Sequence, residues 1–174
     1  LQAHGVTLDK PVGIFMETCY EYVVSYIAIL KAGGAYIPLD LAYPDQLLMN
    51  IFSDAEPKVI VTKSRYGDRL NGSFIGTALR IDSDESWIEC TYDPNAVADI
   101  TPDNLAFLAY TSGTTGDPKG VLQTHRSVVH SYLNRYKTSL YGTDGVLYRE
   151  NINPQTSFSF VTKTDIEGAI VNTI

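Results

Sequence analysis

Leu105-Ala-Phe-Leu-Ala-Tyr-Thr-Ser-Gly-Thr-Thr-Gly-Asp-Pro-Lys-Gly120 is the stretch that decides the fold, because it joins an apolar run to a loop of glycines and hydroxyl side chains. The apolar run is typical of a buried strand. In the loop from Tyr110 to Gly120, glycine lets a ligand approach backbone N–H groups, while the hydroxyls and Lys119 supply further donors. This chemistry suits a phosphate chain, and the alternative is a polar hairpin turn that binds nothing.

Two features of the loop favour a ligand over a plain turn. The eight residues after Tyr110 carry no long side chain, which suits close contact with a bound molecule. The one long cation, Lys119, follows Pro118, whose ring stiffens the approach of the lysine. Beyond the loop, Val121 to Gln123 is expected to pair back on the preceding strand as a hairpin.

Strands and helices are expected to alternate along the rest of the chain. Gly33-Gly34 is expected to end the first helix, and Pro44-Asp45 to open the second. Such alternation favours an α/β fold with a mostly parallel sheet flanked by helices on both faces. The expected strands are 12–16, 35–37, 58–62, 79–82, 105–110 and 155–160, and the expected helices are 18–32, 45–54 and a third from His125 or Ser127 to Tyr136.

Composition limits the class of protein. The chain has 174 residues, 44% of them apolar, which is enough for one globular domain, and its formal charge of −7 argues against a nucleic-acid partner. Cys19 and Cys90 are too few for a disulfide framework, so two reduced thiols in a cytoplasmic protein are expected. The longest apolar stretch, Tyr22 to Leu30, is too short to span a bilayer, so no membrane partner is expected. Glu17 and Glu21 are expected to form a solvated edge.

Neither end of the sequence resembles the natural terminus of a protein. It starts with Leu1-Gln-Ala-His-Gly5, which resembles the end of a helix, and it does not begin with Met. It stops at Ile174 within an apolar segment. We therefore expect a fragment that is truncated at both ends.

The loop differs from the two commonest nucleotide-binding motifs. In the P-loop pattern a glycine precedes the lysine and a Ser or Thr follows it, but here Lys119 lies between Pro118 and Gly120. The hydroxyl that would hold magnesium in a P-loop is therefore missing from its place. The spacing G-x-G-x-x-G of a Rossmann fold is absent as well.

Leu108-Ala-Tyr-Thr-Ser-Gly-Thr-Thr-Gly-Asp-Pro-Lys-Gly120 instead resembles the signature loop of the adenylate-forming enzymes. That superfamily includes acyl-CoA synthetases, aryl-acid ligases, luciferases and the adenylation domains of nonribosomal peptide synthetases. A second segment, Leu30-Lys-Ala-Gly-Gly-Ala-Tyr-Ile-Pro-Leu-Asp40, followed by Tyr43-Pro44, resembles a motif of the peptide-synthetase adenylation domains. We interpret this second segment as scaffold that marks the family without touching substrate.

The resemblance implies a fold and a reaction. Residues 1–174 would be the N-terminal core portion of an AMP-binding (adenylation) domain, with a flavodoxin-like subdomain. The substrate would be a carboxylic acid, with an amino acid as the favoured kind. Its carboxylate would attack the α-phosphorus of ATP, assisted by Mg²⁺, to give an acyl-adenylate and pyrophosphate. A thiol would then take the acyl group, either the phosphopantetheine of a peptidyl carrier domain or CoA.

The resemblance also assigns residues to the ATP phosphates and to the substrate. Among the phosphate-binding residues, Thr115 would be the nearest to Mg²⁺. Further on, Thr156-Ser-Phe-Ser-Phe160 resembles the approach to a carboxylate that pairs with the substrate's α-ammonium, yet Val161 follows and the first carboxylate is Asp165. Three alternatives remain. The substrate has no α-amino group, or the register is shifted and Asp165 binds the amine, or the sequence at this end of the chain has diverged and says nothing about the substrate. The phosphate-binding set is Thr111, Ser112, Gly113, Thr114, Thr115, Gly116 and Lys119.

Other parts of the family's site would lie beyond Ile174: the adenine-contacting segment, the acidic residue that holds the ribose, and the lysine of the small C-terminal lobe. We therefore expect the chain alone to be inactive. The alternatives to a peptide-synthetase adenylation domain are a portion of an acyl- or aryl-CoA ligase, and a non-catalytic nucleotide-binding or interaction module.

Overall fold

A computed structural model describes residues 1–83, 98–112 and 118–138 of the chain. The predicted strand at 155–160 and Asp165 therefore lie outside the described residues. The chain divides into two compact units, Leu1–Val128 and Val129–Ile174. The first unit contains the sheet, and helix α4 (His125–Thr138) begins in it and supplies the described residues of the second.

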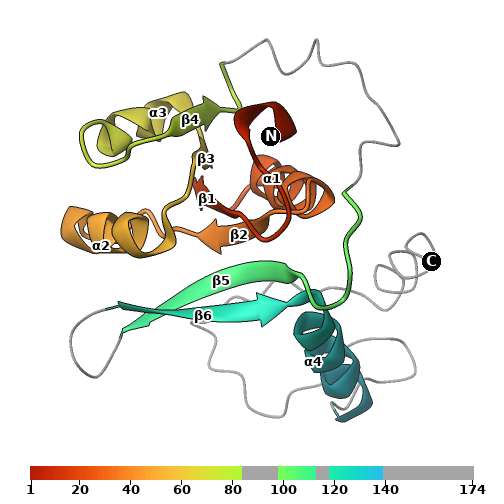
Figure 1. Cartoon of the computed structure of the whole chain (residues 1–174). Coiled ribbons are helices and arrows are strands. Elements are labelled where there is room, and N and C mark those ends of the chain that lie inside the picture. Colours follow the sequence, from red (N-terminus) through yellow and green to blue (C-terminus); the bar gives the residue numbers. More distant parts are fainter. Residues whose placement is uncertain (84–97, 113–117, 139–174) are drawn as a thin grey trace. The chain divides into compact units, whose positions relative to one another are not determined.

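The described part of the first unit is built on a six-stranded sheet with the order β4-β3-β1-β2-β5-β6 (Figure 1). The neighbouring strands from β4 to β5 pair in parallel, and only β6 runs antiparallel to its neighbour β5. The mostly parallel sheet predicted from the sequence is thus confirmed. The strands are β1 (Pro11–Phe15), β2 (Ala35–Pro38), β3 (Val59–Thr62), β4 (Thr77–Arg80), β5 (Leu105–Ser112) and β6 (Pro118–Thr124).

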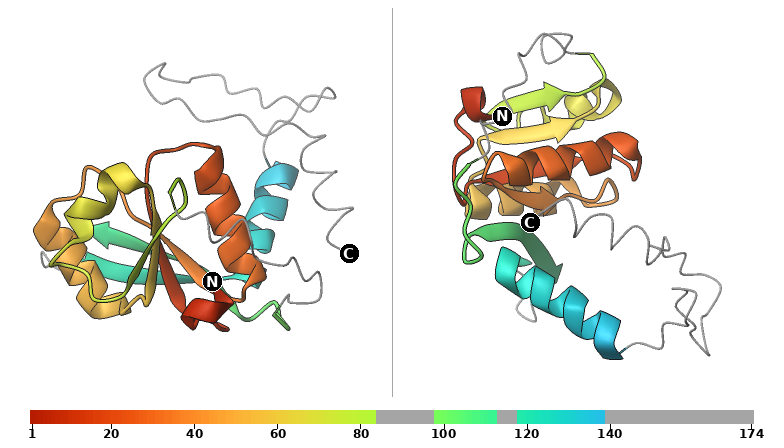
Figure 2. Two further views of the ribbon diagram at one scale, coloured as in Figure 1. Left: turned by 90° about the horizontal axis from the view of Figure 1, so that it is seen from above. Right: turned by 90° about the vertical axis from the view of Figure 1, so that its right-hand side faces the viewer.

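Helices α1 (Tyr20–Lys31) and α2 (Asp45–Ala55) cover opposite faces of this sheet (Figure 2). Each connects two parallel strands, α1 between β1 and β2 and α2 between β2 and β3, as a crossover between parallel strands requires. Three short helical segments complete the described structure: η1 (Gln2–His4), α3 (Ser64–Gly67) and η2 (Asp68–Leu70). No helix of the described residues has the length and apolar character needed to cross a membrane.

The hydrophobic core has two layers, one on each face of the sheet. Successive residues of a strand point to opposite faces, so Phe15 of β1 packs with α2 while its neighbour Ile14 packs on the α1 side. Both side chains are fully buried, which explains why β1 is apolar at consecutive positions rather than at alternate ones. The buried hydroxyl of Thr62 donates a hydrogen bond to the carbonyl of Phe15 at 2.7 Å and links β3 to β1.

Most expected elements are present, with bounds shifted by a few residues. The first helix begins at Tyr20 instead of residue 18, and Gly33 follows it in the left-handed conformation with φ of 86°. The predicted pairing of 121–123 with the strand before the loop is confirmed, since β6 forms a hairpin with β5. Segments α3 and η2 were not predicted from the sequence. The first residues form the short helix η1, which ends at Gly5.

Candidate functional site

The candidate loop connects β5 to β6 at the carboxyl end of β5. Because β5 runs parallel to β2, this end belongs to the carboxyl side of the parallel strands, where ligands of open α/β sheets generally bind. The antiparallel register places Thr111 opposite Lys119 and Ser112 opposite Pro118, so these two pairs form the base of the loop. Thr111 and Lys119 are both exposed and accessible to a ligand.

The structure brings together part of the predicted phosphate-binding set. Thr111 and Ser112 end β5, and Lys119 is the second residue of β6. Lys119 has no ion-pair partner among the described residues. The other predicted members, Gly113, Thr114, Thr115 and Gly116, lie outside the described residues, so their contacts stay predictions.

Tyr110 supports the base of the loop from the α2 side. Its phenol donates a hydrogen bond to Oδ2 of Asp54, in the last turn of α2, at 2.6 Å. Its ring lies against Gly120, where an added Cβ would meet the Cζ of Tyr110 at 3.2 Å. Partial burial and the bond to Asp54 raise the pKa of Tyr110 well above its usual range, so the phenol remains a donor at neutral pH.

Asp54 was not predicted from the sequence, although the sequence contains one signal for it. A carboxylate in the last turn of a helix faces the negative end of the helix dipole, which disfavours it. This position is therefore a signal, although not a specific one, for a contact outside the helix. The partner, Tyr110, lies 56 residues further along the chain, and only the structure identifies it.

The start of β5 is anchored by a second carboxylate. Oδ1 of Asp9 accepts a hydrogen bond from the backbone N–H of Leu105 at 2.6 Å, and Oδ2 accepts one from the side chain of Asn104 at 3.0 Å. Asp9 itself has a left-handed backbone with φ of 63°. The strand that leads to the loop is therefore fixed at its first residue and again at Tyr110.

A separate charged cluster lies where β1 and β3 end. Nζ of Lys63 is 2.9 Å from Oε1 of Glu17 and 3.2 Å from Oε1 of Glu21, and Arg65 also pairs with Glu17. Hydrogen bonding to Lys63 lowers the pKa of Glu17 to about 2, and hydrogen bonds from Cys19 and Lys63 lower that of Glu21 to about 2. The expectation of a solvated edge is wrong, because these two side chains are only 30% and 17% exposed and are paired.

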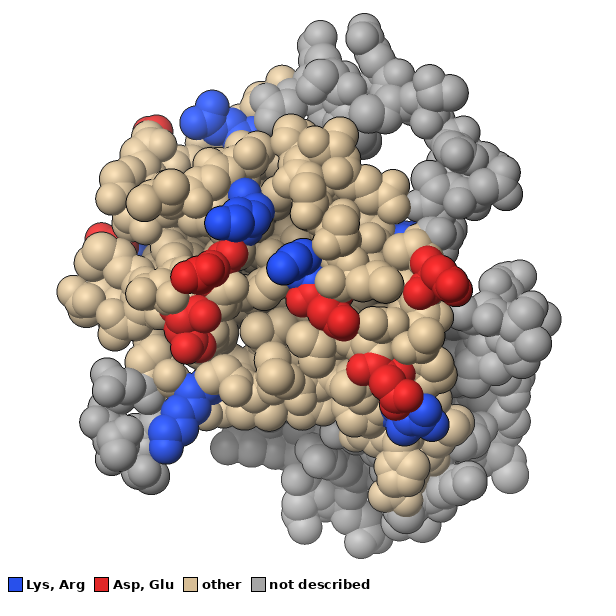
Figure 3. All heavy atoms as spheres, viewed as in Figure 1, with Lys and Arg blue, Asp and Glu red and all other residues tan. Residues whose placement is uncertain are grey.

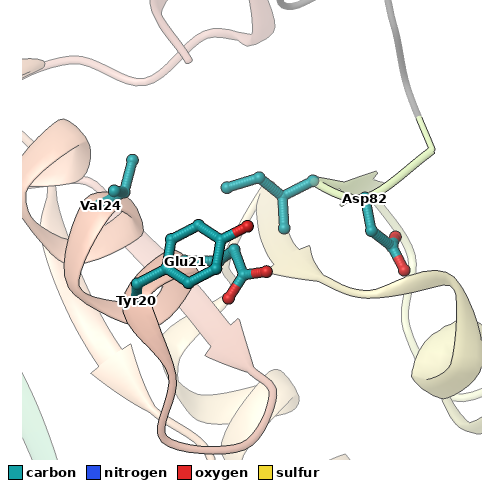
Figure 4. A pocket seen from close by; sticks show the side chains of 5 residues that line it. Tyr20, Glu21, Val24 and Asp82 are labelled. Carbon is teal, nitrogen blue, oxygen red and sulfur yellow. The ribbon is translucent and has the colours of Figure 1, made fainter.

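A hollow of about 290 Å³ adjoins this cluster (Figure 4). It lies between α1 and the residues that follow β4, and is lined by Tyr20, Glu21, Val24, Ile81 and Asp82. Oδ1 of Asp82 accepts hydrogen bonds from the backbone N–H and the hydroxyl of Ser64 at 2.8 and 2.9 Å, which holds the start of α3. The carboxylates of the hollow thus have structural partners.

Charge is balanced locally on the described surface. On the face shown in Figure 3, acidic and basic side chains are interspersed. Arg69 pairs with Asp45 at 2.6 Å and Arg126 with Asp103 at 2.9 Å. No group of three or more His, Cys, Asp or Glu residues that could hold a metal occurs in the described ranges, so the Mg²⁺ contact of Thr115 stays a prediction.

Comparison with known proteins identifies the family. The model of the AMP-binding enzyme family matches residues 1–164 of the chain. The chain belongs to the AMP-binding enzyme family. The resemblance seen in the sequence, to adenylate-forming enzymes and in particular to peptide-synthetase adenylation domains, is thereby confirmed.

Its curated relatives include peptide synthetases. Tyrocidine synthase 3 of Brevibacillus parabrevis is 38% identical over 133 residues, which cover 76% of this chain and 2% of that protein. A linear gramicidin synthase of the same organism is 36% identical over 173 residues, or 99% of this chain and 2% of that protein. The chain therefore spans only a small part of the length of these relatives.

Solved structures agree with this assignment. The nonribosomal peptide synthetase FmoA3 in its α-methyl-L-serine-AMP-bound form is 30% identical with a TM-score of 0.66, over 79% of this chain and 15% of that one. ATP-bound MatB from Rhodopseudomonas palustris is 28% identical with a TM-score of 0.68, over 82% of this chain and 30% of that one. The fold is thus that of the adenylate-forming enzymes.

Proposed function

We propose that the chain is part of an enzyme that activates a carboxylic acid with ATP as an acyl-adenylate and passes the acyl group to a thiol. Residues 1–174 would form the N-terminal core portion of one adenylation domain. The observation that carries the proposal is the β5–β6 hairpin, with an exposed Lys119 opposite Thr111 at the carboxyl end of a parallel-sheet strand. The peptide synthetases among its relatives support an amino acid as the substrate.

The proposed reaction has two steps. An oxygen of the substrate carboxylate attacks the α-phosphorus of ATP, and the bond from that phosphorus to the oxygen bridging to the β-phosphorus breaks and releases pyrophosphate. The thiol sulfur then attacks the acyl carbonyl carbon, the thiol loses its proton, and AMP leaves. Such phosphoryl chemistry depends mainly on positioning and on stabilisation of charge.

The hairpin would supply that stabilisation at the β- and γ-phosphates. Lys119 would contribute a positive charge, and the loop would contribute hydroxyl and backbone N–H donors. Mg²⁺, if held near Thr115, would neutralise further phosphate charge. The proposed donors are Thr111, Ser112, Gly113, Thr114, Thr115, Gly116 and Lys119.

The finer assignments form part of the same proposal. The adenylate bound to FmoA3 is that of an amino acid, which supports a substrate with an α-amino group. In this proposal Asp165 would pair with that amine. The synthetase relatives support the phosphopantetheine of a peptidyl carrier domain, rather than CoA, as the acceptor. We also propose a cytoplasmic location, where ATP is plentiful.

Pyrophosphate exchange tests the proposal. The full-length protein is incubated with ATP, labelled pyrophosphate and a panel of amino acids, each paired with the 2-hydroxy acid of the same side chain and with aryl acids. Exchange that depends on an amino acid supports the proposal. Exchange only with acids that lack the amine would overturn the role of Asp165. ATP binding without exchange would favour a non-catalytic nucleotide-binding module. Residues 1–174 alone are expected to give no exchange.

A further inference from the structure

Asp54 is a residue of α2 whose side chain contacts the base of the candidate loop. Its Oδ2 accepts the hydrogen bond from the phenol of Tyr110 at 2.6 Å, and Tyr110 lies three residues before Gly113, where the described part of β5 has ended. Asp54 is on the exposed side of α2, so its carboxylate needs no partner to avoid a burial penalty. The contact therefore restrains Tyr110 rather than satisfying a buried charge.

The ring of Tyr110 transmits this restraint to β6. Tyr110 and Gly120 are directly opposite each other, and the next pair towards the loop is Thr111 and Lys119. A Cβ on residue 120 would lie 3.2 Å from the Cζ and 3.3 Å from the phenol oxygen of Tyr110, so the ring covers the backbone of Gly120. Holding the phenol in place thus fixes the ring over the residue next to Lys119.

The electrostatics of the contact make it stronger than an ordinary surface hydrogen bond. A hydrogen bond from a hydroxyl to an ionised carboxylate is short and roughly twice as strong as one between neutral groups. The separation of 2.6 Å between Tyr110 and Asp54 falls in that class. It also offsets the unfavourable position of Asp54 near the negative end of α2.

We infer that Asp54 is a positioning residue for the phosphate-binding hairpin: by holding Tyr110, it fixes the spacing of β5 and β6 at the base of the loop, where Thr111 faces Lys119. The inference rests on the proposed function. Without the contact, Thr111 and Lys119 are held less firmly at the base of the loop, so more of their freedom is lost when they bind phosphate, and ATP binds less tightly while the chemical step is unchanged.

Three single variants, one control variant and one double variant of the full-length protein test the inference. Asp54→Ala removes the acceptor, Asp54→Asn keeps a neutral acceptor, and Tyr110→Phe removes the donor. Glu56→Gln is the matched control, because Glu56 is an exposed acidic residue directly after α2, and none of the side-chain hydrogen bonds or ion pairs described above involves it. The double variant Asp54→Ala/Tyr110→Phe shows whether the two side chains act together.

The expected results separate positioning from loss of fold. In the exchange assay, Asp54→Ala raises the KM for ATP, and the energy of the one lost hydrogen bond sets an upper limit of about tenfold, with the KM for the acid and kcat nearly unchanged. Asp54→Asn gives a smaller rise, Glu56→Gln gives none, and the double variant is no worse than Asp54→Ala. The inference is overturned if the KM values of Asp54→Ala match those of Glu56→Gln. It is also overturned if Asp54→Ala raises the KM for ATP and the KM for the acid by the same factor.

A second readout does not depend on activity. Hydrogen–deuterium exchange of the peptide that spans residues 110–120, measured without nucleotide, is expected to be faster in Asp54→Ala than in wild type and in Glu56→Gln. An unchanged rate would overturn the inference even if the protein proves not to adenylate acids. If the wild type shows no pyrophosphate exchange but hydrogen–deuterium exchange is faster in Asp54→Ala, the result would count against the proposed function and would leave the positioning role supported.

Discussion

Replacing Gly33 by alanine is expected to destabilise the first unit of the fold while leaving the ATP chemistry intact. Gly33 follows α1 with φ of 86°, where an L-residue is strained. A Cβ there would lie 2.9 Å from the Cβ of Ala98 and 3.0 Å from Cδ2 of Leu8. The perturbation therefore combines two penalties, one from the backbone and one from packing.

Each penalty has a known size. The left-handed backbone costs about 1–2 kcal/mol for an L-residue, and the reduced freedom of the unfolded chain returns about 0.4–1 kcal/mol. Overpacking at two contacts adds about 1–3 kcal/mol. Gly33→Ala should thus lower the free energy of unfolding by about 1–5 kcal/mol.

Gly72 provides the matched control for this prediction. It has nearly the same backbone, with φ of 82°, but a Cβ there would meet no heavy atom within 4 Å. Gly72→Ala should therefore lose only the backbone part, about 1 kcal/mol. Urea unfolding followed by far-ultraviolet circular dichroism measures both values. Equal losses for the two variants would refute the packing argument, and no loss in either would refute the backbone argument as well.

Two further predictions concern the connection between β1 and β3. Lys63 holds the pKa of Glu17 at about 2, below the unfolded value of 4.5, so this pairing stabilises the fold above about pH 4.5 and its contribution is lost as the pH falls towards 2. Lys63→Met should lower the thermal midpoint at pH 7 and lower it by clearly less at pH 3; the same deficit at both values would contradict this. Thr62→Val removes the buried hydrogen bond to the carbonyl of Phe15 and should cost about 1–2 kcal/mol in urea unfolding, whereas an unchanged midpoint would count against that bond.

The sequence contained enough local information to predict most of the sheet. Apolar runs between proline and glycine predict β1, β2 and β3, because a strand buried on both faces is apolar at consecutive positions. The hairpin of β5 and β6 was predictable because a short loop between adjacent strands favours antiparallel pairing.

Contacts between distant segments were not predictable in this way. Helix α3 is held by Asp82, whose carboxylate accepts hydrogen bonds from Ser64, 18 residues earlier in the chain. The pairing of Glu17 with Lys63 and of Tyr110 with Asp54 likewise joins residues about 50 positions apart. Spacing along the chain contains no signal for such pairs, because the order of the strands, which sets them, follows from tertiary packing.

The sequence predicted which residue types form the candidate site, but it predicted only part of how they are arranged. Residue types identified the phosphate-binding loop, and the register of the hairpin places Thr111 opposite Lys119. The supporting contacts of Asp54 and Asp9 came only from the structure, because both residues are distant in sequence from the strand that they hold.

The affinity of the full-length protein for MgATP, compared between wild type and Lys119→Ala, tests the central claim most directly. Loss of a charged donor to phosphate is expected to weaken binding by about ten- to a hundredfold. Lys58→Ala is the matched control, because Lys58 is an exposed lysine of the same unit, far along the chain from the loop. Weaker binding in Lys119→Ala alone is the predicted result. Equal affinity in wild type and Lys119→Ala would contradict the assignment of the β5–β6 loop to the phosphates of ATP.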